Sequence, residues 1–417
     1  MTATGSTLRS LDCRACCTSV DPDRVHGTCP TCGHTLFATY DLARLDGRAW
    51  LRAVAERPPT LWRYRELLPV RRTESIASLG EGMSPVIELG AVPEAPDLSV
   101  AVKDDGGLPT GSFKARGMAV AVSRARELGL RAVYVPSAGN AGVALAAYAA
   151  RAGLRARVYL PERAPASAGA QCVIYGADLV RVPGTIREAG LAARAAEAGH
   201  GAFDLSTLRE PYRAEGKKTM GLEIFEALHG EGRFPDAIVY PTGGGTGLVG
   251  MKKAFDELRA LGLLDRSPRL YAVQPAGCAP VVRALKDGAP RVEPWADPHC
   301  VAPGLLVPAP FASERILEAV RATGGSGVTV SDRALVEAMR QLAGRHGISA
   351  APEGAAPYAA LGALRADGCL RPGERVLLYN TGTGLGHALP ELVAAAGGGG
   401  SAGAVGPDGF EPPTDRL

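Results

Sequence analysis

The sequence predicts an α/β protein in which mostly parallel sheets are covered by helices on both faces. The chain has 417 residues, 46% of them hydrophobic and 21% charged, a composition typical of a globular protein with two or three domains. Short apolar runs of strand character alternate with amphipathic runs of helical character along most of it. Glycine-rich turns follow several apolar runs, and ligands bind at the carboxyl ends of parallel strands.

The expected elements follow one another in βα order. Residues 41–79 are expected to be helical and connecting segments. Strands are expected within the segments 98–105, 131–142, 155–162, 169–184, 236–258, 269–277 and 375–384. Helices are expected after the strands of 98–105, 131–142 and 236–258, before the strand of 169–184, and over 185–199, 331–347 and 354–368. Residues 394–417 lack periodicity and are expected to be a disordered tail.

Charge and hydropathy exclude several classes of protein. The net charge of +3 is too balanced to indicate a nucleic-acid or membrane partner. No apolar stretch approaches the length of a membrane span, and the N-terminus has no apolar signal core. We therefore expect a cytoplasmic protein. Its nine cysteines, an odd number, argue against a disulfide framework.

Two Cys-x-x-Cys knuckles near the N-terminus predict a metal site. Their members are Cys13, Cys16, Cys29 and Cys32. Four thiolates presented in pairs from tight turns suit tetrahedral Zn²⁺, so the spacing indicates a small structural zinc ribbon over residues 1–40. Cys17 and His34 are alternative ligands, and the competing interpretation is four reduced thiols in a loose arm.

Four sequence features together describe a cofactor site. Lys114, between a glycine-rich loop and a helix, is placed to be desolvated and to react as an amine with an aldehyde. The loop Gly243 to Gly247 precedes a helix and can bind phosphate through backbone N–H groups. Asn140 offers an amide, and Thr381 offers a hydroxyl after the last strand. The combination fits pyridoxal 5'-phosphate, whereas the glycine loop lacks both the P-loop ending and the dinucleotide spacing.

Seven short strings, in order, carry a resemblance to a known family. They are GEGMSPV, LPTGSFKARGM, PSAGNAG, EPYRAEGKKTMG, YPTGGGTGLVGMKKAFDEL, APEGAA and YNTGTG. Over residues 80–385 the chain resembles the threonine synthases, which are fold type II enzymes dependent on pyridoxal phosphate. The resemblance implies two parallel-sheet domains like those of the tryptophan synthase β subunit. The larger would comprise 41–115 and 231–393, and the smaller 116–230. It also implies a homodimer.

The resemblance assigns a role to each matching residue. Lys114 would bind the cofactor covalently and later move a proton, with Phe113 near the cofactor ring. Asn140 would contact the ring hydroxyl, and Thr381 the ring nitrogen. The cofactor phosphate would be held by Gly243, Gly244, Gly245, Thr246 and Gly247. The substrate carboxylate would be received by Ser137, Ala138, Gly139 and Asn140.

The resemblance also implies the substrate, O-phospho-L-homoserine, and the products, L-threonine and phosphate. The substrate phosphate needs a cation, and a guanidinium binds phosphate oxygens in pairs. Arg213 is the best candidate, with Ser206 and Thr207 upstream of it. Lys217 and Lys218 are alternatives. For all of these the competing interpretation is a surface charge at a helix start.

Three positions depart from the family's usual pattern, and one of them is Ala115, where many members have aspartate. Where many threonine synthases carry hydroxyls, this chain has Ala138 and Ala141. A paralogous lyase or β-replacement enzyme acting on phosphoserine, serine, threonine or a related amino acid would share every cofactor residue. An allosteric dehydratase would need a regulatory domain for which little chain remains after residue 390. A zinc ribbon joined to a nucleotide-binding α/β domain is the non-enzymatic alternative.

Overall fold

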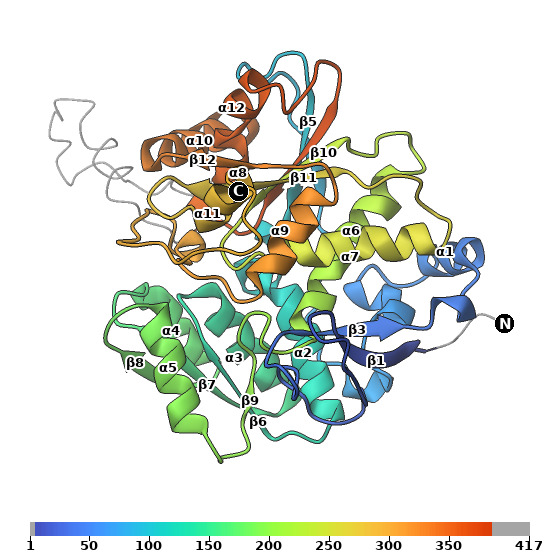
Figure 1. Ribbon diagram of the computed structural model, residues 1–417, viewed down its shortest axis with the longest axis vertical. Helices are drawn as coiled ribbons and strands as arrows, with labels where there is room; N and C mark the ends of the chain where they lie inside the picture. The colour runs from blue at the N-terminus through green and yellow to red at the C-terminus, as the bar shows by residue number, and fades with distance from the viewer. Residues whose placement is uncertain (1–4, 386–417) are drawn as a thin grey trace, which may run out of the picture. The chain divides into compact units, whose positions relative to one another are not determined.

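The larger of two parallel sheets has six strands in the computed structural model, which describes residues 5–385 (Figure 1). Their order is β12-β11-β10-β13-β5-β4. All neighbours are parallel except the edge strand β4, which is antiparallel to β5. The strands are β4 (Val86–Glu88), β5 (Ser99–Asp104), β10 (Ala237–Pro241), β11 (Arg269–Pro275), β12 (Gly327–Val330) and β13 (Arg375–Asn380).

The smaller sheet has four parallel strands in the order β8-β7-β6-β9. These are β6 (Ala132–Pro136), β7 (Arg155–Pro161), β8 (Asp178–Val182) and β9 (Phe203–Asp204). The connecting helices are α3 (Asn140–Ala152), α4 (Ala166–Ile174) and α5 (Ile186–Glu197). In sequence, the small sheet is therefore formed by the part of the chain that lies between β5 and β10 of the large sheet. The boundaries given above for the larger domain (41–115 and 231–393) and the smaller domain (116–230) remain predictions from the sequence.

Three helices lie at the centre of the molecule, α2 (Lys114–Glu127), α6 (Arg213–Leu228) and α7 (Thr246–Ala260). Glycines let them approach closely. A Cβ atom at Gly216 would lie 2.1 Å from the carbonyl oxygen of Arg116, and one at Gly250 would lie 2.7 Å from Cβ of Lys217. Helix α6 is consequently packed between α2 and α7, and nearly all its side chains are buried.

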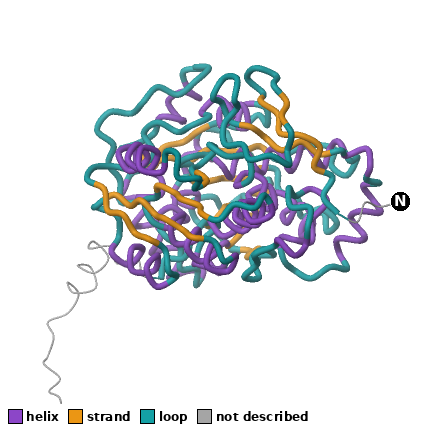
Figure 2. The backbone as a smooth tube through the Cα atoms, turned by 90° about the horizontal axis from the view of Figure 1, so that it is seen from below, coloured by secondary structure: helices purple, strands orange, loops and turns teal. Residues whose placement is uncertain are grey.

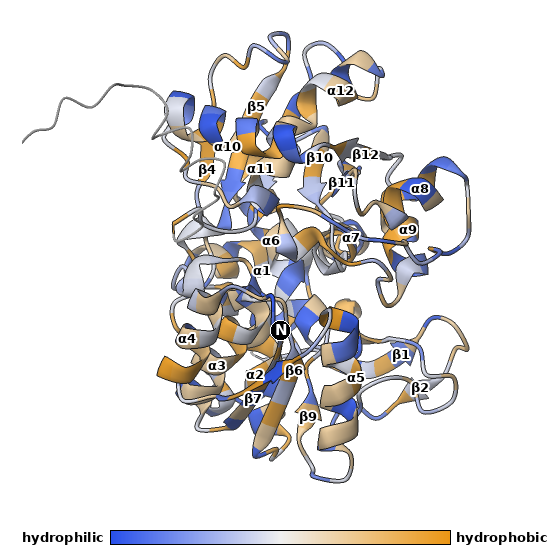
Figure 3. Ribbon diagram, turned by 90° about the vertical axis from the view of Figure 1, so that its left-hand side faces the viewer, coloured by the Kyte–Doolittle hydropathy of each residue, from blue (hydrophilic) through white to orange (hydrophobic). Residues whose placement is uncertain are grey.

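Outer helices complete the two layers, and Figure 2 shows strands enclosed by helices and loops. They are α1 (Gly47–Ala55), α8 (Pro280–Lys286), α9 (Ser313–Arg321), α10 (Asp332–His346), α11 (Pro352–Ala359) and α12 (Leu361–Ala366). Helix α10 buries Leu335, Ala338, Met339 and Leu342 and turns polar residues outward, which gives it two colours in Figure 3.

The N-terminal segment is a three-stranded antiparallel ribbon of β1 (Leu8–Cys13), β2 (Ser19–Val20) and β3 (Leu36–Tyr40). It packs beside the central helices. Tyr40 donates a 2.9 Å hydrogen bond to Glu215 on α6, and the Lys218 ammonium lies 3.9 Å from the Tyr40 ring centroid. The first cysteine knuckle begins with the last residue of β1, Cys13, and the second lies between β2 and β3.

The strands and helices expected from periodicity form where they were predicted, with two qualifications. The helix expected over 354–368 is divided at Ala360 into α11 and α12. The expected tail, 394–417, lies outside the described residues. No helix among residues 5–385 has the length and apolar character of a membrane span.

Candidate active site

Lys114 begins α2, and the loop before it is bonded to the loop after β13. The Phe113 N–H donates to the Thr381 carbonyl at 2.9 Å, and Ser112 forms an antiparallel bridge with Gly382. A Cβ atom at Gly382 would lie 3.8 Å from the amide nitrogen of Asn140. Three segments that the sequence predicts to bind one cofactor therefore meet at one place.

The Gly243–Gly247 loop joins β10 to the N-terminus of α7. Side chains of neighbouring elements pack closely against its glycines. Gly245 has φ +68°, and a Cβ atom there would lie 2.4 Å from Ile316. A Cβ atom at Gly247 would lie 2.1 Å from the Tyr240 hydroxyl. Within residues 5–385, the N–H groups of Gly243, Gly244 and Gly245 donate no hydrogen bond. Free N–H groups at a helix N-terminus are what a phosphate requires, so the loop fits the phosphate of pyridoxal phosphate.

The Ser137–Gly142 turn is held together by a side chain. The Ser137 hydroxyl accepts the N–H groups of Gly139 at 3.0 Å and Gly142 at 2.8 Å, and is itself buried. Asn140, at the start of α3, is exposed. Ser137 therefore shapes the turn, whereas Asn140 and the partly buried Ala138 are free to face a ligand.

Three cations lie close together without ionic partners. Lys114 and Lys217 lie 4.0 Å and 4.2 Å from the same Phe113 ring centroid, and Lys217 donates to the Phe113 carbonyl. Arg213 is only 3% exposed and Lys217 1%. No ion pair forms between these three and a carboxylate in the described part of the chain. Buried unpaired charge is costly, so this arrangement favours anionic ligands.

Burial and nearby cations set the protonation of the two lysines. Burial, aided by the Arg213 guanidinium and opposed by Glu353, lowers the pKa of Lys114 to about 7. Burial, Lys114 and Arg213 lower the pKa of Lys217 well below its ordinary range. A neutral amine at Lys114 is the reactive form toward an aldehyde.

The residues upstream of Arg213 also reach the site. A Cβ atom at Gly244 would lie 2.9 Å from the Thr207 methyl group. The Arg213 guanidinium donates to the Leu205 carbonyl at 2.6 Å, leaving its other N–H groups free among the described residues. Ser206 instead bonds to Asp204. The competing interpretation of Arg213, Lys217 and Lys218 as surface charges is wrong, since all three are buried.

Sequence reasoning missed two acidic groups, although both lie in strings quoted above. Glu210 accepts the N–H groups of Tyr212 at 2.7 Å and Arg213 at 3.1 Å, and burial raises its pKa to about 7. Glu353 accepts the Gly304 N–H at 2.6 Å and influences Lys114 electrostatically. The string of Glu210 also carries the predicted site residue Arg213, which was a signal, whereas the string APEGAA around Glu353 carries no predicted site residue.

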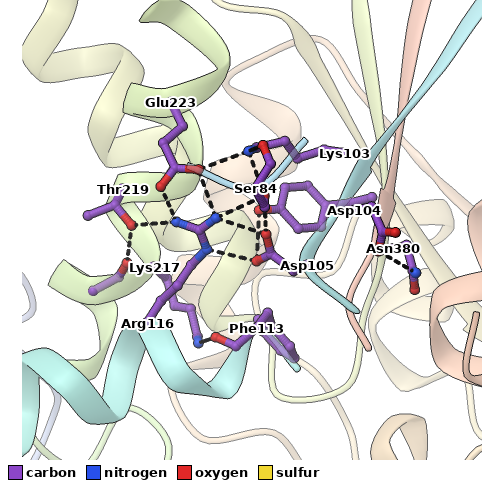
Figure 4. Close-up of polar contacts among 12 residues, drawn as sticks. Ser84, Lys103, Asp104, Asp105, Phe113, Arg116, Lys217, Thr219, Glu223 and Asn380 are labelled. Carbon is purple, nitrogen blue, oxygen red and sulfur yellow. Dashed lines mark hydrogen bonds and ion pairs between the residues drawn. The ribbon is translucent and has the colours of Figure 1, made fainter. Parts of the chain in front are cut away.

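A buried ionic network holds the helix that bears Lys114 (Figure 4). Arg116 contacts Asp105 through Nε at 2.7 Å and also pairs with Glu223 on α6. The Glu223 carboxylate forms an ion pair with the Lys103 ammonium at 2.8 Å. The network links β5, α2 and α6. Because Arg116 lies two residues after Lys114, the network holds in place the first turn of α2, which carries Lys114.

The four predicted cysteines of the ribbon form one cluster. Their Sγ atoms all lie within 4.8 Å of one another, with Cys13 and Cys32 3.4 Å apart and Cys16 and Cys29 3.6 Å apart. Neither Cys17 nor His34 belongs to this group. Four sulfurs about 2.3 Å from one Zn²⁺ would lie about 3.8 Å apart, so the cluster fits a tetrahedral ion.

Comparison with known proteins agrees with this geometry. The sequence pattern of a family described as pyridoxal-phosphate dependent enzyme matches residues 77–382. Maize serine racemase has the same fold, with a TM-score of 0.64 and 20% identity over 75% of this chain and 91% of that one. Fold and site thus define a fold type II enzyme dependent on pyridoxal phosphate.

Sequence relatives specify the family further. Threonine synthase of Methanocaldococcus jannaschii is 33% identical over 375 residues, covering 89% of this chain and 92% of that protein. Threonine synthase of Synechocystis sp. is 35% identical over 325 residues, covering 77% and 81%. The chain belongs to the threonine synthase family.

Proposed function

We propose that the protein is a threonine synthase, which converts O-phospho-L-homoserine and water into L-threonine and phosphate. The relatives' activity supports this proposal, and one feature of the site carries it. Arg213 is a buried guanidinium with free N–H groups and no carboxylate partner in the described residues, beside a lysine suited to hold the cofactor. A phosphate-bearing substrate supplies the missing anion.

The cofactor-binding residues have separate tasks. Pyridoxal phosphate, when bound, supplies an electron sink for chemistry at the carbons of an amino acid. Lys114 would hold the cofactor and move the substrate's Cα proton, which a pKa of about 7 allows in both directions. The N–H groups from Gly243 to Gly247 would bind its phosphate, with Thr381 at the ring nitrogen and Asn140 at the ring hydroxyl.

Substrate binding would use two helix N-termini. The turn before α3, with Ala138, Gly139 and Asn140, would receive the carboxylate. Arg213 would bind the substrate phosphate, assisted by Thr207 and Lys217. The free thiols of the four-cysteine cluster would bind a structural Zn²⁺. We further propose that the enzyme acts in the cytoplasm as a homodimer.

The test is turnover of O-phospho-L-homoserine by the holoenzyme, measured as phosphate and threonine. We expect Arg213→Ala to lose most of this activity while keeping the visible absorption of bound pyridoxal phosphate. Arg187→Ala, on the exposed end of α5, is the matched control and should behave as wild type.

O-Phospho-L-serine is the competing substrate, because Ala138 and Ala141 carry no hydroxyl. Turnover of phosphoserine without turnover of phosphohomoserine would replace the proposed activity by that of a paralogous lyase. Equal activity of Arg213→Ala and wild type would remove Arg213 from the substrate site.

A further inference from the structure

The cysteine ribbon is bonded to the loop of residues 205–212, which joins β9 to α6. The Thr35 hydroxyl donates a 2.7 Å hydrogen bond to the Leu208 carbonyl, and both residues are buried. A Cβ atom at Gly27 would lie 3.3 Å from the Arg209 carbonyl oxygen. The ribbon therefore contacts two successive peptide groups of this loop.

The same loop contacts the active site through other residues. The Leu205 carbonyl accepts the Arg213 guanidinium at 2.6 Å. The Thr207 methyl group lies against Gly244 in the proposed cofactor-phosphate loop. A shift of the loop at Leu208 would thus move both the guanidinium and one wall of the phosphate site.

Leu208 is held in a conformation that leucine rarely adopts. Its φ is +59°, in the left-handed region, where a side chain with Cβ is disfavoured. Within the described residues, the Leu208 carbonyl has Thr35 as its only hydrogen-bond donor. An outside contact that fixes this carbonyl therefore helps to hold the backbone in its strained conformation.

Thr35 is in turn held by the second cysteine knuckle. It forms an antiparallel bridge with Thr28 across the turn that contains Cys29 and Cys32. The Cys29 N–H donates to the His34 carbonyl at 2.7 Å, which closes that turn. Contacts that hold the second knuckle in place therefore also hold the Thr35 hydroxyl in place. That hydroxyl in turn holds the Leu208 carbonyl.

We propose that Thr35 is a positioning residue for the phosphate side of the active site, and that the ribbon serves to hold the 205–212 loop in its binding conformation. The role assigned to the loop rests on the proposed function, because Arg213 and Thr207 are the proposed partners of substrate phosphate. The ribbon acts on that site from outside it, without touching substrate or cofactor.

The test compares Thr35→Val with Thr28→Val in the holoenzyme. The two threonines face each other in one bridge, but of the two side chains only that of Thr35 donates a hydrogen bond to the 205–212 loop in the described residues. We expect Thr35→Val to weaken inorganic phosphate binding about five-fold, the effect of one hydrogen bond, and to raise KM for phosphohomoserine similarly. Thr28→Val should resemble wild type, Thr35→Ser should restore binding, and the cofactor absorption should stay unchanged.

Phosphate binding, followed by cofactor fluorescence, separates this inference from the proposed function. If wild type does not turn over phosphohomoserine, the proposed function fails, while the effect of Thr35→Val on phosphate binding still decides the positioning role. Equal phosphate affinity in Thr35→Val, Thr28→Val and wild type overturns it. If Thr35→Val does not fold, Gly27→Ala decides, since its added methyl group presses on the Arg209 carbonyl. Unchanged phosphate affinity in that variant overturns the inference too.

Discussion

Replacing Glu223 by glutamine should destabilise the protein in a pH-dependent way. Burial alone would raise the pKa of this carboxyl group, but Arg116 and Lys103 outweigh burial and lower it from 4.5 to about 2. This lowering of the pKa corresponds to about 3 kcal/mol of unfolding free energy. Glutamine keeps the shape of the side chain and removes its charge, so Glu223→Gln should lose about that amount at pH 7.

The sign of the pH dependence follows from the lowered pKa. The carboxylate contributes its full stabilisation above pH 4.5 and loses it as the pH falls toward 2. The variant has no titrating group at this position. The difference between wild type and Glu223→Gln should therefore shrink from about 3 kcal/mol at pH 7 to about 2 kcal/mol at pH 3.5.

Urea unfolding at the two pH values measures this difference. Asp256→Asn, which breaks a partly exposed pair with Lys252 on the surface of α7, is the control and should change the unfolding free energy by less than about 0.5 kcal/mol. A Glu223→Gln effect as small as that of the control would refute the reasoning. So would an effect of the same size at pH 7 and pH 3.5, because charge would then not be its cause.

Two further predictions concern the cofactor and the metal. Since the pKa of Lys114 is about 7, capture of pyridoxal phosphate by the apoenzyme should be about ten-fold slower at pH 6 than at pH 8, as followed by visible absorption. A rate that is flat over this range would contradict the lowered pKa, and Lys114→Ala should show no borohydride-sensitive band. Metal analysis should find one zinc per chain in wild type and much less in Cys29→Ser, whereas Cys172→Ser, a buried cysteine outside the cluster, should keep it. Zinc-free wild type after gentle purification would argue against the metal site.

The elements that the sequence could predict are those with a local signal. Strand β10, the glycine loop and helix α7 follow from an apolar run, a glycine string and an amphipathic run in immediate succession. Two glycines of that loop are required by side chains of other elements, Ile316 on α9 and Tyr240 on β10, but glycine itself is visible in the sequence. The meeting of the Lys114 and Thr381 loops was likewise predictable, because parallel strands end at a common edge.

Burial of α6 could not be predicted in the same way. Its first turns contain Arg213, Glu215, Lys217 and Lys218, a composition typical of a solvated helix. The helix is buried because glycines on three helices allow α2, α6 and α7 to pack at short range. The contact of α2 with α6 joins segments far apart in the chain and has no local signature. The Thr35–Leu208 bond has the same character, since it joins residues 173 positions apart.

Two neighbouring lysines on α6 are both buried, but one is paired with carboxylates of the protein and the other faces the proposed active site. Lys218 is paired with Glu215 at 2.7 Å and Glu257 at 2.9 Å, so its charge is neutralised within the protein. Lys217, one residue earlier, points from the same helix toward Phe113 and Lys114 and forms no ion pair in the described residues. One residue along a helix turns the side chain by about 100°, which is enough to exchange one set of neighbours for the other. The charge of Lys218 is balanced by two carboxylates of the protein, whereas burial and neighbouring cations lower the pKa of the unpaired Lys217, which is left to pair with an anionic ligand; α6 carries both kinds of lysine.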